Sequence, residues 1–358
     1  MDRELLKQAS RIVVKLGTGI LTDDRNHPDV AQIEQIVLQI TALRKKGKEV
    51  VVVTSGAVGA GMGVLKLGKK PSQLARMQAC AAIGQSRLMT VYERLFSKNG
   101  LHVGQVLLSH EDLEDQDRHL KARNTLLALL DHGIIPIINE NDAVSVTELK
   151  FGDNDRLSAL VACLLPADLL ILLTSVEGLI QNFDQPNSHR IAEVARIDRQ
   201  ILEIAKNTSS PTAVGGMGSK IDAAKIAMRS GIPMVIASGR RKRTLSDIIR
   251  AKDIGTLFIP NAKKLAGKKR WIAFFHHPFG SLLVDDGAQE ILRQGGKSLL
   301  HPGIMECRGD FNSGDVVRIC DEDGTEFARG ISRKSSSEIR NREKTLKVIV
   351  HCNHMVIL

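Results

Sequence analysis

The stretch that decides the fold reads IIPIINENDAVSVTELKFGDND and spans residues 134–155. It begins with an apolar, isoleucine-rich run at 134–138, which is the pattern of a short buried strand. Carboxylates and amides follow at 139–142 and again at 153–155. In an open α/β sheet, ligands bind just beyond the carboxyl ends of the strands. The cluster therefore predicts either a small-molecule site or, on its own composition, a solvated Asn/Asp-rich turn.

Working outward, short apolar runs alternate with segments of helical periodicity. Residues 11–16 and 50–54 predict strands, and apolar residues recur at helical spacing between 33 and 43. Further strands are predicted at 103–108, 169–173 and 234–237, with helices at 71–97, 118–132, 156–164 and 221–229. This alternation predicts a doubly wound, mostly parallel α/β sheet, and we expect the run at 234–237 to close it. Residues 181–190 read as a polar loop.

The pattern changes after residue 260. Residues 261–270 form a basic, polar stretch, which we interpret as a linker. Beyond it, short apolar runs and glycine-containing turns predict a small β-rich domain over 271–358. The expected organisation is an α/β domain at 1–260, the linker, and this second domain.

Composition indicates an ordinary globular protein. Of 358 residues, 43% are apolar and 25% charged, and the formal net charge is +10. The excess is spread out, with 34 Lys/Arg against 28 Asp/Glu in residues 1–260 and 16 against 12 in the remainder. Aromatic residues make up only 3%, which leaves few platforms for stacking bases. These features do not favour nucleic-acid binding as the main function, and a basic protein also suits an anionic small substrate.

The cysteines and the hydropathy pattern suggest a compartment. Five cysteines form no CxxC pair, and their odd number argues against a disulfide framework. The N-terminus has no signal-peptide pattern, and Pro166 and Asp168 interrupt the most apolar window. We therefore expect a reducing cytoplasm and no membrane span.

Three glycine-rich stretches follow strands or open helices, at residues 17–19, 56–61 and 215–218. None matches the P-loop or the dinucleotide-binding fingerprint, and each could serve only to let the backbone turn tightly. The stretch GGMGSK (215–220) is more specific. It places glycines, a hydroxyl and Lys220 at the start of a helix, where backbone N–H groups and the helix dipole favour an anion.

These residues suit phosphoryl transfer to a carboxylate. A carboxylic acid is already ionised at neutral pH, so this reaction needs no general base. The barrier is repulsion between two anions, which positive charge, a metal ion and backbone donors reduce. Lys15 and Lys220, each in a glycine-rich stretch, are candidates to supply the charge, and Asp155 is a candidate to hold both ammonium groups.

Five segments, taken in order, resemble the glutamate 5-kinases of the amino-acid kinase family. They are VVKLGTGIL (13–21), VVVTSGAVGAG (51–61), AAIGQSRLM (81–89), INENDAVSVTELKFGDND (138–155) and GGMGSK (215–220). The part from KRWIAFF (269–275) to VIVHCNHMVIL (348–358) resembles a PUA module. The resemblance implies the amino-acid kinase fold and ATP-dependent phosphorylation of L-glutamate to L-glutamyl 5-phosphate, the first step of proline biosynthesis.

The resemblance also implies roles for matching positions. The catalytic residues would be Lys15, Asp155 and Lys220, and the glutamate site would contain Ser55, Asn139, Asp142 and Asn154. The residues in the nucleotide-binding positions are Lys15, Thr174, Ser175, Val214, Gly215, Gly216, Met217, Gly218, Ser219 and Lys220. Val214 and Ser219 stand where threonines are usual, and Ser175 stands where an aspartate is common, so these departures bear on nucleotide affinity.

Cofactors and partners follow from the same resemblance. It implies Mg²⁺ with ATP, feedback inhibition by proline, a homo-oligomer (tetramer or dimer), and hand-over of the labile product to glutamyl phosphate reductase. No protein ligand for a metal stands out; His276 and His277, and the closing HCNH at 351–354, read as parts of the small domain. The alternatives are a sister kinase acting on N-acetylglutamate or aspartate, and an RNA-binding protein acting through the PUA-like domain.

Overall fold

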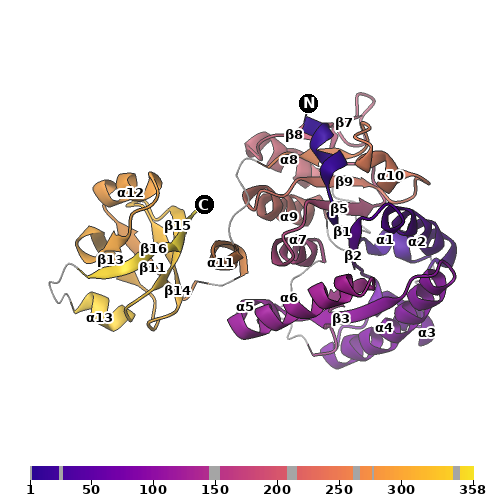
Figure 1. Cartoon of the computed structure of the whole chain (residues 1–358), viewed down its shortest axis with the longest axis horizontal. Coiled ribbons are helices and arrows are strands. Elements are labelled where there is room, and N and C mark those ends of the chain that lie inside the picture. The colour runs from indigo at the N-terminus through magenta and orange to yellow at the C-terminus, as the bar shows by residue number, and fades with distance from the viewer. Residues whose placement is uncertain are drawn as a thin grey trace. The chain divides into compact units, whose positions relative to one another are not determined.

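The computed structural model divides the chain into two compact units, Met1–Lys264 and Leu265–Leu358, and each unit is described by itself (Figure 1). The residues that the structure describes are 2–23, 27–144, 154–207, 216–260, 267–275, 278–341 and 347–358.

The first unit is built on an eight-stranded sheet with the order β3-β4-β2-β1-β5-β9-β10-β8. Its strands are β1 (Arg11–Leu16), β2 (Glu49–Val53), β3 (Val103–Leu108), β4 (Ile135–Glu140), β5 (Leu169–Thr174), β8 (Glu193–Val194), β9 (Met234–Ser238) and β10 (Thr256–Phe258). From β3 to β9 in this order all neighbours pair in parallel, and β10 pairs antiparallel with β9. The predicted doubly wound, mostly parallel sheet is confirmed.

One expectation for this sheet is wrong. The run at 234–237 does not close it, because β10 and β8 lie beyond β9. These strands have three and two residues, too short to show a periodic pattern. Of the stretch predicted as a polar loop at 181–190, residues 182–187 form turns and bends as expected, and only its ends pair, in an antiparallel hairpin of β6 (Ile180–Gln181) and β7 (His189–Arg190).

Helices cover both faces of the sheet. They are α1 (Thr18–Leu21), α2 (Val30–Arg44), α3 (Ala57–Val64), α4 (Leu74–Ser97), α5 (His110–Glu114), α6 (Gln116–Asp131), α7 (Asn154–Leu164), α8 (Arg199–Asn207), α9 (Met217–Arg229) and α10 (Thr244–Ile249), after a 3-10 helix η1 (Asp2–Gln8). In α2, the Asp29 side chain caps the first turn by accepting from the Gln32 amide. Helices α7 and α9 pack on each other, as Figure 1 also shows.

The alternation of side chains along β1 decides where its lysine points. Ile12, Val14 and Leu16 belong to the hydrophobic core that the sheet shares with α2 and α4. Since successive side chains of a strand point to opposite faces, Lys15 lies on the other face, on which α7 packs against β1. Lys15 therefore points into the layer that contains α7 and α9.

Helices α3 and α4 pack backbone against backbone. A Cβ on Gly61 would lie 1.9 Å from the carbonyl oxygen of Cys80, and a Cβ on Gly84 would lie 1.7 Å from that of Ala57. The stretch at 56–61 is therefore only partly the turn that we expected. Gly56 adopts φ +90° at the N-cap of α3, but the later glycines allow helices to approach closely. This packing brings α4 against the carboxyl end of β2.

The second unit is β-rich, as predicted. Its six-stranded sheet has the order β12-β16-β15-β14-β11-β13. The strands are β11 (Gly280–Val284), β12 (Leu299–Leu300), β13 (Ile304–Arg308), β14 (Val316–Cys320), β15 (Glu326–Ser332) and β16 (Val348–Ile357). The helices are α11 (Gly267–Arg270), a π-helix η3 (Trp271–Phe275), α12 (Asp286–Arg293), a 3-10 helix η4 (His301–Gly303) and α13 (Ser336–Arg340). Trp271 is buried, and α11 occupies part of the expected linker.

Candidate active site

Polar residues gather at the carboxyl edge of the first sheet. Lys15 lies near the end of β1, Thr54 and Ser55 follow β2, and Asn139 lies at the end of β4. Because β4, β2, β1 and β5 are neighbouring parallel strands, their carboxyl ends meet along one edge. The sheet topology thus brings together residues that are more than 100 positions apart in the chain.

Asp155 joins the two candidate lysines. It lies in the first turn of α7, where a carboxylate also complements the helix dipole. Its Oδ1 contacts the ammonium of Lys15, and its Oδ2 lies 2.9 Å from Nζ of Lys220, in the first turn of α9. The side chain of Asp155 is 0% exposed, and those of Lys15 and Lys220 are 4% and 9% exposed. Lysines from strand β1 and helix α9 thus converge on one buried carboxylate.

The two lysines control the charge of Asp155. Burial alone would raise the pKa of its carboxyl group, because a charged group loses solvation there. The positive charges of Lys15 and Lys220 and their hydrogen bonds outweigh burial and lower the pKa to about 2. Asp155 is therefore ionised at neutral pH, and the three groups together carry a net positive charge.

The start of α9 is suited to an anion. Its N-cap is Gly216, for which the described residues supply no side-chain cap hydrogen bond, and the backbone N–H groups at the start of a helix favour an anion. The Ser219 hydroxyl lies 3.0 Å from both Asp155 Oδ2 and the Gly216 carbonyl oxygen. A triphosphate tail placed here would meet Lys15, Lys220 and these N–H groups together, so the residues present fit a nucleotide.

The other nucleotide-binding candidates are placed as follows. Thr174 ends β5 and is half-buried, and Ser175 follows it and is exposed; β5 adjoins β1, the strand of Lys15. Met217 is buried in the first turn of α9, and Gly218 follows it there. Val214 and Gly215 lie outside the described residues.

A series of hydrogen-bonded amide side chains begins at Asn154, next to Asp155, and ends at Gln85 of helix α4. Asn154 Nδ2 donates to the Thr54 carbonyl oxygen at 2.7 Å, to Ser55 Oγ at 3.0 Å and to Asn139 Oδ1 at 2.9 Å. Asn139 Nδ2 in turn donates to Gln85 Oε1 at 2.7 Å. Three of the four expected glutamate contacts, Ser55, Asn139 and Asn154, are therefore joined to one another beside Asp155.

The fourth expected contact, Asp142, lines a cleft of about 520 Å³ next to this series of amides. Side chains of α4, β3 and the segment after β4 form its walls, including Gln85, Gln105 and Asp142. Gln85 lies in the segment AAIGQSRLM (81–89), and the sequence alone assigns it no role. A glutamine between small residues of a helix was the available signal, but it carries no chemistry until its neighbours are known.

A metal site built from protein ligands does not occur in the described part of the chain, where no three His, Cys, Asp or Glu side chains form a suitable group. Both oxygens of Asp155 contact lysines. Mg²⁺ favours octahedral coordination that includes waters and substrate phosphates. The residues present therefore fit a metal that is held mainly by a nucleotide. His276 and His277 lie outside the described residues.

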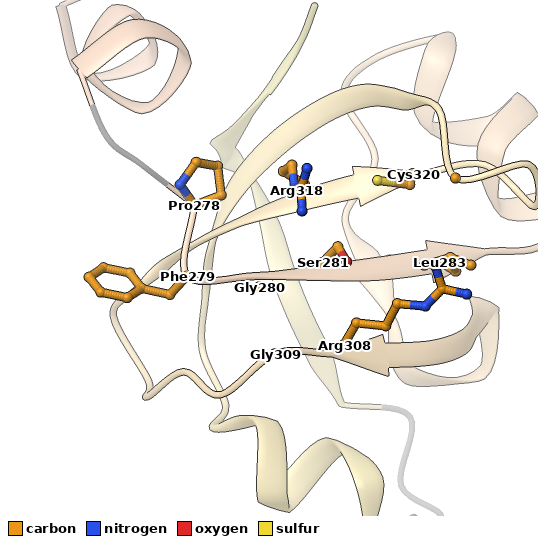
Figure 2. Close-up of a pocket in the computed structure, with 10 residues that line it drawn as sticks. Pro278, Phe279, Gly280, Ser281, Leu283, Arg308, Gly309, Arg318 and Cys320 are labelled. Atoms are coloured by element: carbon orange, nitrogen blue, oxygen red, sulfur yellow. The ribbon is translucent and has the colours of Figure 1, made fainter. Parts of the chain in front are cut away.

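The second unit has a smaller groove of about 250 Å³ between β11, β13 and β14 (Figure 2). Ser281 on β11 pairs in register with Arg308 on one side and Arg318 on the other. Both arginines are exposed, and Arg308 forms a 2.6 Å ion pair with Glu306. Phe279 stands at the rim and is 56% exposed.

Two further features of the sequence are a run of basic residues at 240–243 and five cysteines. Residues 240–243, the run of four basic side chains, are exposed, as expected for a surface loop. All five cysteines are free thiols. A search of the described residues found no helix with both the length and the apolar character needed to cross a membrane.

Comparison with known proteins supports two domain families. The sequence pattern of the amino acid kinase family matches residues 10–238, and that of the PUA domain matches residues 280–351. A glutamate 5-kinase from Pelobacter propionicus is 42% identical over 373 aligned positions that cover 100% of both chains. A glutamate 5-kinase from Geobacter sp. strain M21 is 45% identical over 341 positions, covering 95% of this chain and 91% of the relative.

Solved structures share the fold at low sequence identity. Carbamate kinase from Giardia lamblia bound to AMP-PNP superposes with a TM-score of 0.51 at 18% identity, covering 71% of this chain and 100% of that protein. Isopentenyl phosphate kinase from T. acidophilum, in a product complex, gives a TM-score of 0.50 at 17% identity, covering 69% and 99%. At these identities the two structures support the fold of the first unit alone.

Proposed function

Because the chain belongs to the glutamate 5-kinases of the amino acid kinase family, we propose that it phosphorylates the side-chain carboxylate of L-glutamate with ATP. The products are L-glutamyl 5-phosphate and ADP. The observation that carries the proposal is the buried Lys15–Asp155–Lys220 cluster next to a cleft lined with amides and Asp142. A PUA domain forms the C-terminal part of the chain.

The reaction transfers one phosphoryl group. A carboxylate oxygen of glutamate forms a bond to the γ-phosphorus, the bond from that phosphorus to the β–γ bridging oxygen breaks, and ADP leaves with the electron pair. No proton must be removed from the nucleophile, because the carboxylate is already ionised at neutral pH. The protein therefore needs to position two anions and to stabilise the charge on the transferring group.

We assign that stabilisation to Lys15 and Lys220. Asp155 holds the two ammonium groups near each other, although like charges repel, and it keeps them at one place in the absence of substrate. Their burial strengthens the interaction with a phosphate, since charges attract more strongly where water is excluded. The start of α9 adds backbone N–H donors.

Mg²⁺ and the wider assembly belong to this proposal as well. Bound with ATP, Mg²⁺ would neutralise part of the phosphate charge. Ser219, Lys15 and Lys220 would contact the other phosphate oxygens. Feedback inhibition by proline, a homo-oligomeric state, a cytoplasmic location and hand-over to glutamyl phosphate reductase rest on the family resemblance. Repeating the activity assay with added proline, and measuring the mass of the purified protein in solution, would test the first two.

A substrate panel tests the proposed activity. The full chain is incubated with ATP, Mg²⁺ and hydroxylamine, which traps acyl phosphates as coloured hydroxamates. L-Glutamate, N-acetylglutamate and L-aspartate are compared, and we expect product with glutamate only. A clear preference for N-acetylglutamate or aspartate would assign the chain to a sister activity, and the absence of hydroxamate with all three would remove the proposal.

A further inference from the structure

Backbone groups fix the orientation of the amide side chains beside Asp155. The backbone N–H of Glu140 can only donate, and it lies 3.0 Å from Asn139 Oδ1, so the oxygen of that amide must face it. The nitrogen of Asn139 is then the atom that lies 2.7 Å from the Gln85 side chain. Since Asn139 donates there, Gln85 must present its oxygen, and its –NH₂ group must point away from Asn139.

Among the residues that the structure describes, the –NH₂ donor of Gln85 then has no acceptor. Gln85 is 8% exposed, and its Nε2 is a buried atom with no hydrogen-bond partner among the described residues. Gln85 also lines the 520 Å³ cleft that contains Asp142. Buried polar atoms in folded proteins nearly always have a partner, so an unsatisfied donor on a cleft wall suggests that a ligand supplies the acceptor.

The position of Gln85 within the series of amides indicates which part of a ligand it meets. The order from the two lysines is Asp155, Asn154, Asn139 and then Gln85. The γ-carboxylate of glutamate, which accepts the phosphoryl group, must lie at the end with the lysines. The donor of Gln85 lies at the opposite end of this series, where the α-carboxylate is the remaining anionic group of the substrate.

We propose that Gln85 is a specificity-determining residue whose Nε2–H donates to the α-carboxylate of the amino-acid substrate. The proposal rests on the proposed kinase activity and adds a contact to it. The helix contact between α3 and α4, which Gly61 and Gly84 make possible, holds Gln85 at the cleft wall. Asn139 holds its amide in the donating orientation before any substrate arrives.

The test uses a variant that changes only the donor. Gln85→Glu keeps an oxygen for Asn139 and replaces the –NH₂ group by a second oxygen. Glutamate is compared with 4-aminobutyrate, which has the same chain and amino group but no α-carboxylate. We expect kcat/KM for glutamate to fall about 10- to 100-fold through KM, as loss of a hydrogen bond to a charged group predicts. The KM for ATP should change little.

The decisive measurement is the ratio of kcat/KM for glutamate to kcat/KM for 4-aminobutyrate. In the unchanged chain, kcat/KM should strongly favour glutamate over 4-aminobutyrate; in Gln85→Glu this preference should shrink by about tenfold or more, since the lost contact serves glutamate alone. Gln85→Met, of similar length, removes the donor without adding charge and should shrink the preference in the same direction. Circular dichroism and thermal unfolding verify the fold of each variant.

Gln116→Glu is the matched control, because Gln116 is exposed at the start of α6 and does not line the cleft. This variant should leave the ratio of the two kcat/KM values unchanged. An equal loss for both substrates in folded Gln85→Glu and Gln85→Met would show a structural role and overturn the proposal. An equal shift of the preference in Gln116→Glu would attribute the effect to added charge and would overturn the proposal too. Absence of glutamyl hydroxamate with the unchanged chain would instead refute the kinase activity itself.

Discussion

The Lys15–Asp155–Lys220 cluster of the first unit and the groove of the second unit both contain basic side chains, but the two sites hold them in opposite ways. In the first unit, Lys15 and Lys220 are buried on either side of the fully buried Asp155. In the second, Arg308 and Arg318 are exposed, and the partner of Arg308 is Glu306, whose side chain is 51% exposed. A buried charge costs free energy unless it is paired, whereas exposed pairs cost and contribute little.

That difference separates a preorganised site from a charged surface. A fold that keeps three ionised groups out of water forgoes the stability that apolar residues of similar volume could give. The arrangement is therefore best explained by what the ammonium groups do to a bound anion. Exposed arginines need no such explanation. The comparison predicts that substitutions in the buried cluster have large effects on activity and that substitutions in the groove have small ones.

The largest effect is expected from Lys220→Ala. It removes one of the two ammonium groups from the transferring phosphoryl group, so we expect kcat to fall about 100- to 1,000-fold. Hydroxamate formation with saturating glutamate and ATP measures this loss. Lys225→Ala is the matched control, because Lys225 lies on the same helix, is partly exposed and pairs with Asp222. It should retain activity within about twofold.

Two results would contradict this assignment. Near-normal turnover in folded Lys220→Ala would exclude Lys220 from the chemical step. A similar loss in Lys225→Ala would indicate that α9 as a whole, and not the buried ammonium, is required. Circular dichroism distinguishes either result from unfolding.

A second prediction concerns stability in acid. The pKa of Asp155 is about 2 in the folded chain and about 4 when unfolded, so its charged form stabilises the fold above about pH 4. This contribution, roughly 2 kcal/mol, should disappear as the pH falls from 4 to 2. Urea unfolding followed by circular dichroism at several pH values measures it.

Asp155→Asn is the reference for that measurement, because Asn resembles a protonated Asp in shape and charge. The variant should be less stable than the unchanged chain at pH 7, and the difference between the two should narrow as the pH approaches 2. If the difference instead stays constant between pH 5 and pH 2, Asp155 is not the ionised partner of the two lysines.

Much of the fold could be predicted because the longer strands of the first sheet are mostly apolar. The strands at 11–16 and 103–108 were predicted with the bounds that the structure has. The short strands β8 and β10 could not be predicted, since two or three residues show no periodicity. The glycines of α3 were misread because a glycine that admits a neighbouring helix looks the same in sequence as one that turns the chain.

The candidate site was predictable only in part. Lysines in glycine-rich stretches and the Asn/Asp clusters stand out by composition, and the family resemblance suggested that they belong together. Their roles in catalysis stay predictions. Gln85 did not stand out, because its importance depends on which atom of an amide faces Asn139, and that in turn depends on the Glu140 backbone. Such a relation exists only in three dimensions.

The smallest effect is expected from the double variant Arg308→Gln with Arg318→Gln. Both side chains are exposed in the groove of the second unit, so kcat/KM for glutamate should stay within about twofold of the unchanged chain. Filter binding to a labelled RNA over a salt series provides the second measurement. We expect the unchanged chain to bind RNA weakly and without sequence preference. In the variant, the slope of the logarithm of the binding constant against the logarithm of the salt concentration should be smaller in magnitude by at most about two.

This variant tests whether the exposed arginines of the groove contribute to the kinase reaction. A tenfold loss of kinase activity would mean that exposed arginines take part in the reaction, and the contrast between a buried site and a charged surface would fail. Tight, sequence-specific RNA binding that the variant abolishes, with kinase activity intact, would give the second unit a separate function. Equal activity and only a smaller salt slope would support the contrast, because exposed charge would then attract anions without selecting among them.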